Sequence, residues 1–198
     1  MNKYYIIYKP FQVLSQFTPE NNKACLKDFF EVPTDVYPVG RLDYDSEGLL
    51  LLTNDKSLNH RLLHPSFAHE REYRVQVEGL ITNEALQLLS SGITINVDGK
   101  PFRTAAAKAS RLPEHIVIQE RIPPIRFRQH IPTSWIKLVI TEGKNRQVRK
   151  MTAATGFPTL RLIRYRLAAL TLDSMLPGDM IDMNQNDVYG KLGLLTHI

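Results

Sequence analysis

Short segments in which apolar and polar residues alternate constrain the fold of this chain most strongly. From Glu72 to Gly79 every second residue, beginning with Tyr73, is apolar, so an extended chain there has one apolar and one polar side. The segment from Trp135 to Thr141 alternates in the same way. The first pattern predicts a half-buried strand with Tyr73 on its apolar side, and the second predicts a strand that is central in a sheet.

Other segments predict further strands and two helices. The strand-like segments are Tyr4 to Tyr8, Leu49 to Thr53, Ile93 to Val97, His115 to Gln119 and Leu160 to Leu172. One helix is expected to follow a cap at Thr82 or Asn83 and to end near Gly92, and another to run from a cap at Asn145 to Gly156. Strands separated by only a few helices indicate an α+β fold with a mixed, mainly antiparallel sheet.

The length of the chain and its cysteine content limit its organisation. A chain of 198 residues without repeats or linker-like segments is expected to form one compact unit over residues 1–198, which could be bilobed. Cys25 is the only cysteine, so no internal disulfide can form, as is typical of a reducing compartment. The first residues do not resemble a signal peptide, and no apolar run approaches the roughly 20 residues of a membrane span. We therefore expect a cytoplasmic protein.

Positive charge is concentrated between Arg121 and Arg166. This segment holds eleven arginine and lysine residues and one acid, Glu142, so its net charge is +10, whereas the rest of the chain carries −5. A field of one sign attracts phosphate backbones, although a solvated basic face would have the same composition. Aromatic residues in the segment, such as Trp135, favour RNA because unpaired bases stack on aromatic rings.

The segment from Gly40 to Gly48 combines Arg41 with three carboxylates, the first of them Asp43. A calcium-binding EF-hand loop begins similarly but requires a glutamate where Asn54 stands. A two-metal nuclease would draw carboxylates from several elements, and no partner motif is found. Taken alone, the segment is explained most simply as a tight turn that the glycines permit and whose acids stay solvated.

Two other patterns give weak indications of chemistry. His60 and His64 are spaced to bind a metal from one helical face, but Pro65 follows at once and a third ligand is not evident. We interpret them as ordinary histidines at a helix end. The chain also has no GxSxG segment that would indicate a serine nucleophile.

Four segments, in order, resemble the bacterial ribosomal RNA pseudouridine synthases of the small-subunit synthase A family. They are Lys9 to Ser15, Gly40 to Thr53, Glu72 to Val75, and Glu142 to Met151. The second, GRLDYDSEGLLLLT, is similar to the long and highly specific catalytic motif of that family. The resemblance extends from about Tyr5 to Met183 and is closest to a short member that acts on the large ribosomal subunit. Gln12 departs from it, since many relatives have glycine there.

The resemblance implies a pseudouridine synthase fold in which the Asp43 loop and the helix after Asn145 meet in a central active-site cleft. It implies isomerisation of a specific uridine to pseudouridine in large-subunit (23S) ribosomal RNA, without a metal or other cofactor. The chain has no room for an N-terminal S4 RNA-binding domain before Lys9, so the catalytic domain itself is expected to dock on the RNA. We expect a monomer whose partner is ribosomal RNA.

The same resemblance assigns roles to individual residues. It makes Asp43 the catalytic carboxylate, Tyr73 the residue beside the target base, and Arg149 the basic partner of Asp43. The residues expected to contact RNA are Arg41, Arg126, Arg128, Lys144, Arg146, Lys150, Arg161 and Arg164. Two other functions stay open: a noncatalytic RNA-binding ribosome-assembly factor and a metal-dependent nuclease.

Overall fold

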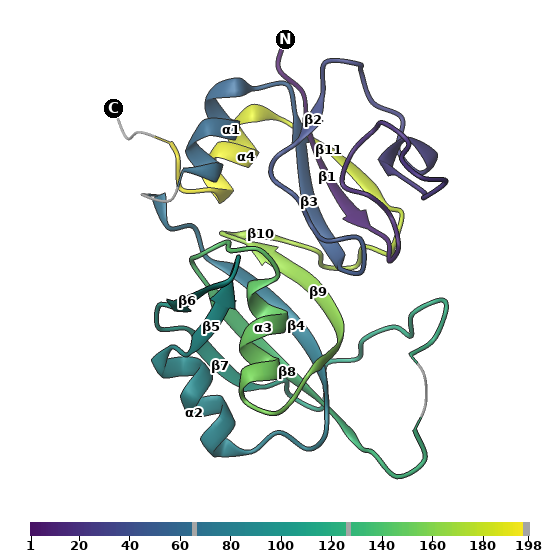
Figure 1. Cartoon of the computed structure of the whole chain (residues 1–198). Coiled ribbons are helices and arrows are strands. Elements are labelled where there is room, and N and C mark those ends of the chain that lie inside the picture. Colours follow the sequence, from purple (N-terminus) through teal and green to yellow (C-terminus); the bar gives the residue numbers. More distant parts are fainter. Residues whose placement is uncertain (65–66, 126–127, 196–198) are drawn as a thin grey trace. The chain divides into compact units, whose positions relative to one another are not determined.

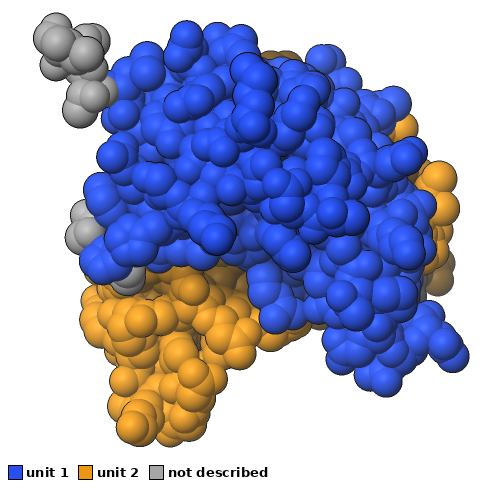
Figure 2. Space-filling model, turned by 90° about the horizontal axis from the view of Figure 1, so that it is seen from above, with its two compact units in different colours: residues 1–69, 164–198 blue, residues 70–163 orange. Residues whose placement is uncertain are grey.

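The computed structural model divides the chain into two compact units, which Figure 2 distinguishes by colour. Unit 1 comprises Met1–His69 and Arg164–Ile198, and unit 2 comprises Glu70–Ile163. The structure describes residues 1–64, 67–125 and 128–195. The chain passes from unit 2 back into unit 1 within strand β9 (Thr159–Leu167), so the two segments of unit 1 flank unit 2 in the sequence.

Unit 1 is built around two strands that are buried along their whole length, β1 (Tyr4–Lys9) and β3 (Glu47–Thr53). Its strands follow the order β11-β1-β3-β9, with β2 on β3 and β10 on β9, and β1 is antiparallel to both of its neighbours (Figure 1). The remaining elements are η1, a short 3₁₀ helix (Leu26–Asp28), β2 (Tyr37–Pro38), α1 (Lys56–Leu63), β10 (Leu170–Thr171), β11 (Met180–Met183) and α4 (Gln185–Lys191).

Burial on both faces explains why β1 and β3 have continuous apolar runs instead of alternation. One face of the pair packs Tyr5, Ile7, Leu50 and Leu52 into a core with the segment that precedes β2. On the other face, the hydroxyls of Tyr4 and Tyr189 each donate to Asp55 Oδ2 at 2.7 Å, while Asp55 Oδ1 caps α1. These bonds fasten α1 and α4 to the sheet of unit 1.

Unit 2 packs two helices on one face of an antiparallel sheet. Its strands follow the order β9-β4-β8-β7, and β5 pairs with β6 in a separate hairpin. The elements are β4 (Arg71–Glu78), α2 (Asn83–Ser91), β5 (Thr94–Val97), β6 (Lys100–Arg103), β7 (Lys108–Arg111), β8 (Thr133–Ile140) and α3 (Gln147–Ala154). The core combines apolar residues of both helices with those of β4 and β8.

Most of the expected elements are confirmed. In β4, Tyr73 and every second residue after it are buried, and β8 lies between β4 and β7, as a central strand does. Thr82 caps α2 by accepting a hydrogen bond from Ala85 N at 3.2 Å, and the helix ends at Gly92 with φ +82°. The α+β fold with a mainly antiparallel sheet and flanking helices agrees with the sequence-based prediction.

Two local predictions were wrong. His115 to Gln119 is described but forms no strand, because Ile116 N closes a turn onto Pro113 O and Val117 is almost fully exposed, without a neighbouring strand. The N-cap of α3 is Arg146, not Asn145, and Arg146 has the left-handed φ of +52°. The side chain of Gln147, the first residue of α3, accepts a hydrogen bond from Lys144 N in the loop before the helix. This contact links the helix start to that loop, and Asn145 does not cap the helix.

Two further findings concern the local backbone and the longest helices. Gln12, which stands where many relatives have glycine, has φ +56°, a left-handed conformation that glycine adopts easily. No helix formed by the described residues is long and apolar enough to cross a membrane.

Candidate active site

Asp43 lies in the loop between β2 and β3, and hydrogen bonds fix the backbone on both sides of it. Ser15 Oγ accepts from Leu42 N at 3.0 Å and donates to Leu42 O at 2.8 Å. Ser46 N donates to Asp43 O at 3.0 Å and so closes a tight turn. Leu42 and Ser46 are buried, whereas Asp43 is half-buried. The loop is therefore fixed while part of Asp43 stays accessible.

The first residues of β3 lie against Arg164 of β9. Gly48 has φ +112°, and a Cβ atom there would lie 2.4 Å from the carbonyl oxygen of Arg164, so only glycine fits. Arg164 is 6% exposed, and its Nε donates to Leu49 O at 2.7 Å. Because this guanidinium group is buried and supports β3 from inside unit 1, we expect Arg164 to stabilise the fold and not to contact RNA.

Lys9 places a buried cation beside the same loop. The residue is 0% exposed, and its Nζ donates to the carbonyl oxygens of Pro10 at 2.9 Å and of Val13 at 2.7 Å. Both acceptors belong to the segment directly after β1. Lys9 therefore holds the chain where it leaves the sheet of unit 1.

Burial and neighbouring charges act on Lys9 in opposite directions. Loss of hydration lowers the pKa of Lys9 from 10.5 to about 7, although the negative charges of Glu47, Asp45 and Asp43 favour the protonated form. Arg164 lowers the pKa of Lys9 further. Lys9 thus interacts electrostatically with Asp43 and with the charged residues Asp45, Glu47 and Arg164.

Sequence reasoning assigned no role to Lys9 or Glu47. The sequence signal for both residues was a charge next to an apolar run. Lys9 directly follows YYIIY, and Glu47 directly precedes GLLLL. A charge that extends such a run is expected to be buried and therefore to have defined partners.

Unit 2 contains the other two predicted catalytic residues. Tyr73 is on β4, opposite Leu138 of β8, and is 9% exposed within the core of the unit. Arg149 is half-buried in the first turn of α3. Asp43 and Arg41 therefore share one loop in unit 1, while Tyr73 and Arg149 are placed by two elements of unit 2.

A hydrogen-bond network fixes the start of α3, two residues before Arg149. The buried side chain of Gln147 accepts from Lys144 N at 3.0 Å and donates to Glu142 Oε2 at 2.8 Å. Glu142 Oε2 also accepts from Ala105 N at 3.0 Å. The network joins the helix, the loop before it and the segment after β6.

The residues predicted to contact RNA differ in their exposure. Arg126 lies outside the described residues. Arg161 is buried, and its Nη1 donates to Gln119 O at 2.6 Å. Lys150 is half-buried, whereas the side chains of Arg41, Arg128, Lys144 and Arg146 are exposed.

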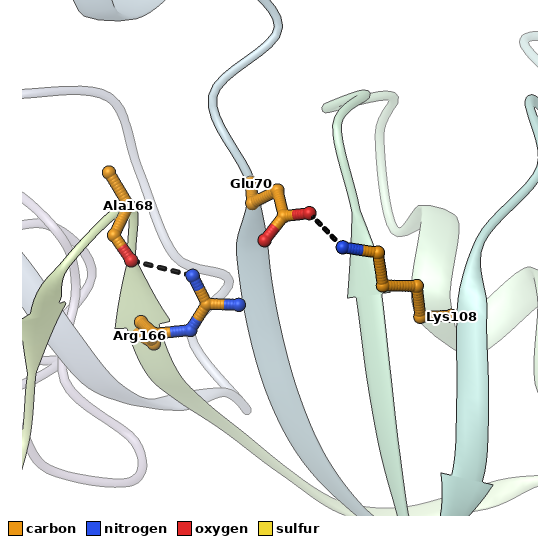
Figure 3. A network of polar contacts seen from close by, with 4 residues as sticks. All are labelled: Glu70, Lys108, Arg166 and Ala168. Carbon is orange, nitrogen blue, oxygen red and sulfur yellow. Dashed lines mark hydrogen bonds and ion pairs between the residues drawn. The ribbon is translucent and has the colours of Figure 1, made fainter. Parts of the chain in front are cut away.

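Some cations of the chain are engaged in contacts within their own unit. In unit 1, Arg166 Nη1 donates to Ala168 O at 2.6 Å, and in unit 2, Lys108 forms an ion pair with Glu70 (Figure 3). Within the basic segment from Arg121 to Arg166, Arg161 and Arg164 are buried, so the net charge of the segment overstates the number of its cations that face solvent.

The rings of His60 and His64 lie 5.5 Å apart, at the last turn and the C-cap of α1, as expected for histidines at a helix end. Among the described residues, no group of three or more histidine, cysteine, aspartate or glutamate side chains could hold a metal ion.

The fold and the fixed Asp43 loop define the class of protein. The profile of the RNA pseudouridylate synthase family matches residues 3–154, and the chain belongs to this family. A solved structure described as a pseudouridylate synthase superposes with a TM-score of 0.78 at 25% identity, over 97% of this chain and 74% of that one. The family resemblance predicted from the sequence is thereby confirmed.

Curated relatives give more detailed similarities. Ribosomal large subunit pseudouridine synthase E of Vibrio parahaemolyticus is 46% identical over 176 residues, which cover 89% of this chain and 71% of that protein. The enzyme of the same name from Xanthomonas axonopodis pv. citri is 46% identical, over 87% of this chain and 89% of its own length. Ribosomal large subunit pseudouridine synthase B of Bacillus subtilis is 36% identical over 98% of this chain and 73% of its own.

Proposed function

We propose that this pseudouridine synthase isomerises a specific uridine of large-subunit (23S) ribosomal RNA. The observation that carries the proposal is the segment from Gly40 to Thr53, which resembles the catalytic motif of the family and begins with a fixed loop that presents Asp43. The substrate class is supported by the relatives at 46% identity, whose names specify the large ribosomal subunit.

The reaction requires few catalytic groups. The bond from ribose C1′ to N1 of uracil breaks, the base turns, and C1′ bonds to C5 instead. The C5 proton is removed and N1 gains a proton, so all atoms are retained and the reaction is redox-neutral. A positioned carboxylate, with a group that assists the C5 proton transfer, can supply this chemistry.

In this proposal Asp43 is the catalytic carboxylate, and Tyr73 and Arg149 act on the same uridine in the RNA complex. The cation of Arg149 favours the ionised form of Asp43. Tyr73 contacts the extracted uracil and assists removal of the C5 proton. Its position in the core of unit 2 is compatible with that role, because a buried tyrosine ring is held in one orientation.

Extraction of a uridine from folded RNA costs a few kcal/mol, because the base leaves its stack. Contacts to phosphates offset this cost. The cations that serve this purpose in our proposal are those with accessible side chains, namely Arg41, Arg128, Lys144, Arg146 and Lys150.

The direct test maps pseudouridine in ribosomal RNA that was transcribed without modifications. The purified protein is expected to produce one new pseudouridine in the large-subunit RNA with chelator present, whereas Asp43→Asn produces none. Asp45→Asn removes a carboxylate from the same loop and is expected to modify the same uridine. RNA cleavage that depends on a metal would indicate a nuclease, and tight binding without modification would indicate an assembly factor.

A further inference from the structure

Unit 2 contains a pocket of about 630 Å³. The strands β4, β8 and β9 contribute part of its lining, and the loop before β8 contributes the rest. Gln76 of β4 and Trp135 of β8 are register partners within it, as are Glu78 and Thr133. The volume lies in the range of about 300–1,000 Å³ found for sites that bind small molecules.

The pocket lies on the other face of β4 from Tyr73. Side chains alternate along a strand, and Tyr73, Val75 and Val77 belong to the helix-covered core of unit 2. Gln76 and Glu78 therefore point to the opposite face, where they line the pocket. Among these lining side chains the proposed function uses only Arg128, as a contact to the RNA backbone.

Trp135 gives the pocket a planar aromatic surface. The residue is half-buried, and the guanidinium carbon of Arg161 lies 5.9 Å from its ring centroid. Arg161 is itself 4% exposed and is fixed by its hydrogen bond to Gln119 O. The ring is thus supported by a buried, hydrogen-bonded cation, which suits a surface on which another flat ring stacks.

The polar groups around Trp135 match the remaining parts of a nucleotide. Arg128 Nη1 lies 3.0 Å from Glu78 Oε2, with side chains 53% and 24% exposed, and Arg121 also lines the pocket. Guanidinium groups bind phosphate oxygens through several donors. Glu78 and the amide of Gln76 can bind the donor and acceptor groups on the edge of a base.

We propose that this pocket binds an unpaired nucleotide of the RNA substrate, separate from the uridine that reacts. Its base stacks on Trp135 and its phosphate is held by Arg121 and Arg128. The inference rests on the proposed function, which supplies the RNA. Such a site would contribute to specificity, since it requires an unpaired nucleotide at one position of the substrate relative to the target uridine.

Trp135 is the only tryptophan of the chain, so tryptophan fluorescence reports on this pocket. Titration of the full-length protein with short single-stranded RNA is expected to change the emission to saturation, whereas inorganic phosphate at the same phosphate concentration leaves it unchanged. An equal response to phosphate would show that the pocket binds an anion without a base and would overturn the proposal. Unchanged emission at saturating RNA would overturn it as well.

Variants of Trp135 give the second test. Trp135→Ala is expected to weaken binding of the ribosomal RNA substrate about 5- to 150-fold, as expected for the loss of one base–aromatic stack, and to raise KM with a smaller effect on kcat. Trp135→Phe, which keeps a ring, should retain most of the affinity. Tyr37→Ala, which removes an exposed aromatic ring from unit 1, is the matched control.

The inference fails if folded Trp135→Ala, checked by circular dichroism, binds the RNA as tightly as the unaltered protein. If Trp135→Ala does not fold, the affinity of Trp135→Phe and the fluorescence of the unaltered protein decide the question. Asp43→Asn should keep the fluorescence response although it lacks activity. An active protein whose Trp135 fluorescence does not respond to RNA would therefore contradict this inference only. Full activity of Asp43→Asn would contradict the proposed function.

Discussion

At the scale of single residues, Lys9 makes the stability of the fold depend on pH. The pKa of Lys9 is 10.5 when hydrated and about 7 when buried in unit 1. Below pH 7 both the folded and the unfolded chain hold this proton, and the cost of the buried charge is fully present. Between about pH 7 and 10.5 only the unfolded chain holds it, so the free energy of unfolding rises with pH, by up to about 1.4 kcal/mol per pH unit.

The variant Lys9→Met isolates this effect because it cannot titrate. We expect the free energy of unfolding of the unaltered protein, relative to that of Lys9→Met, to increase as pH rises through this window. Urea denaturation at several pH values measures the difference. A difference that stays constant with pH would show that Lys9 keeps its ordinary pKa.

Gly48→Ala tests the close approach of β3 to Arg164. The added Cβ would meet the Arg164 carbonyl oxygen, so we expect a loss of about 2–4 kcal/mol in the free energy of unfolding. Gly99→Ala is the matched control, since Gly99 also has a positive φ, +82°, but nothing lies within 4 Å of its Cβ position. It should lose only about 1–2 kcal/mol. Equal losses would argue against the steric contact.

At the scale of elements, the start of α3 depends on Gln147. Gln147→Ala removes its bonds to Lys144 and Glu142, and we expect it to lower the free energy of unfolding by about 1–3 kcal/mol. Asn145→Ala is expected to change it by less than about 0.5 kcal/mol, because Asn145 is exposed and is not the N-cap. Urea denaturation measures both losses. A larger loss for Asn145→Ala than for Gln147→Ala would indicate that Asn145 caps the helix.

Elements with a strong local signal were predictable from the sequence. The alternation after Tyr73 predicts β4, and the cap at Thr82 with Gly92 predicts α2. The start of α3 was misplaced because the side chain that binds the preceding loop lies inside the helix, at Gln147. The short strands β2 and β11 pair with β3 and β1, which are separated from them in the sequence, so local patterns do not reveal them.

At the scale of the whole molecule, the basic segment should make RNA binding depend strongly on salt. Each phosphate contact contributes about 0.7–0.9 to the slope of log affinity against log salt. We expect Lys150→Gln to lower that slope by about this amount. Lys56→Gln, which removes an exposed lysine from α1 of unit 1, should leave the slope unchanged. Binding assays over a range of salt concentrations would contradict the assignment if both variants behaved alike.

The candidate site was predictable only in part. The motif around Asp43 identified the family, but single residues of the basic segment could not be sorted from sequence. Arg161 and Arg164 carry the same charge as Arg128, yet both are buried and donate hydrogen bonds to main-chain carbonyl oxygens. Net charge is a property of composition, whereas exposure depends on the packing of β9, which no local pattern specifies.

The role of Asp43 in catalysis is tested most directly by tritium release from ribosomal RNA labelled at C5 of uridine. Each turnover replaces the C5–H bond by a C5–C1′ bond, so the label passes into water. We predict release by the unaltered protein and by Asp45→Asn, and a rate about 10²- to 10⁴-fold lower for folded Asp43→Asn. Equal release by Asp43→Asn and the unaltered protein would contradict Asp43 as the catalytic carboxylate.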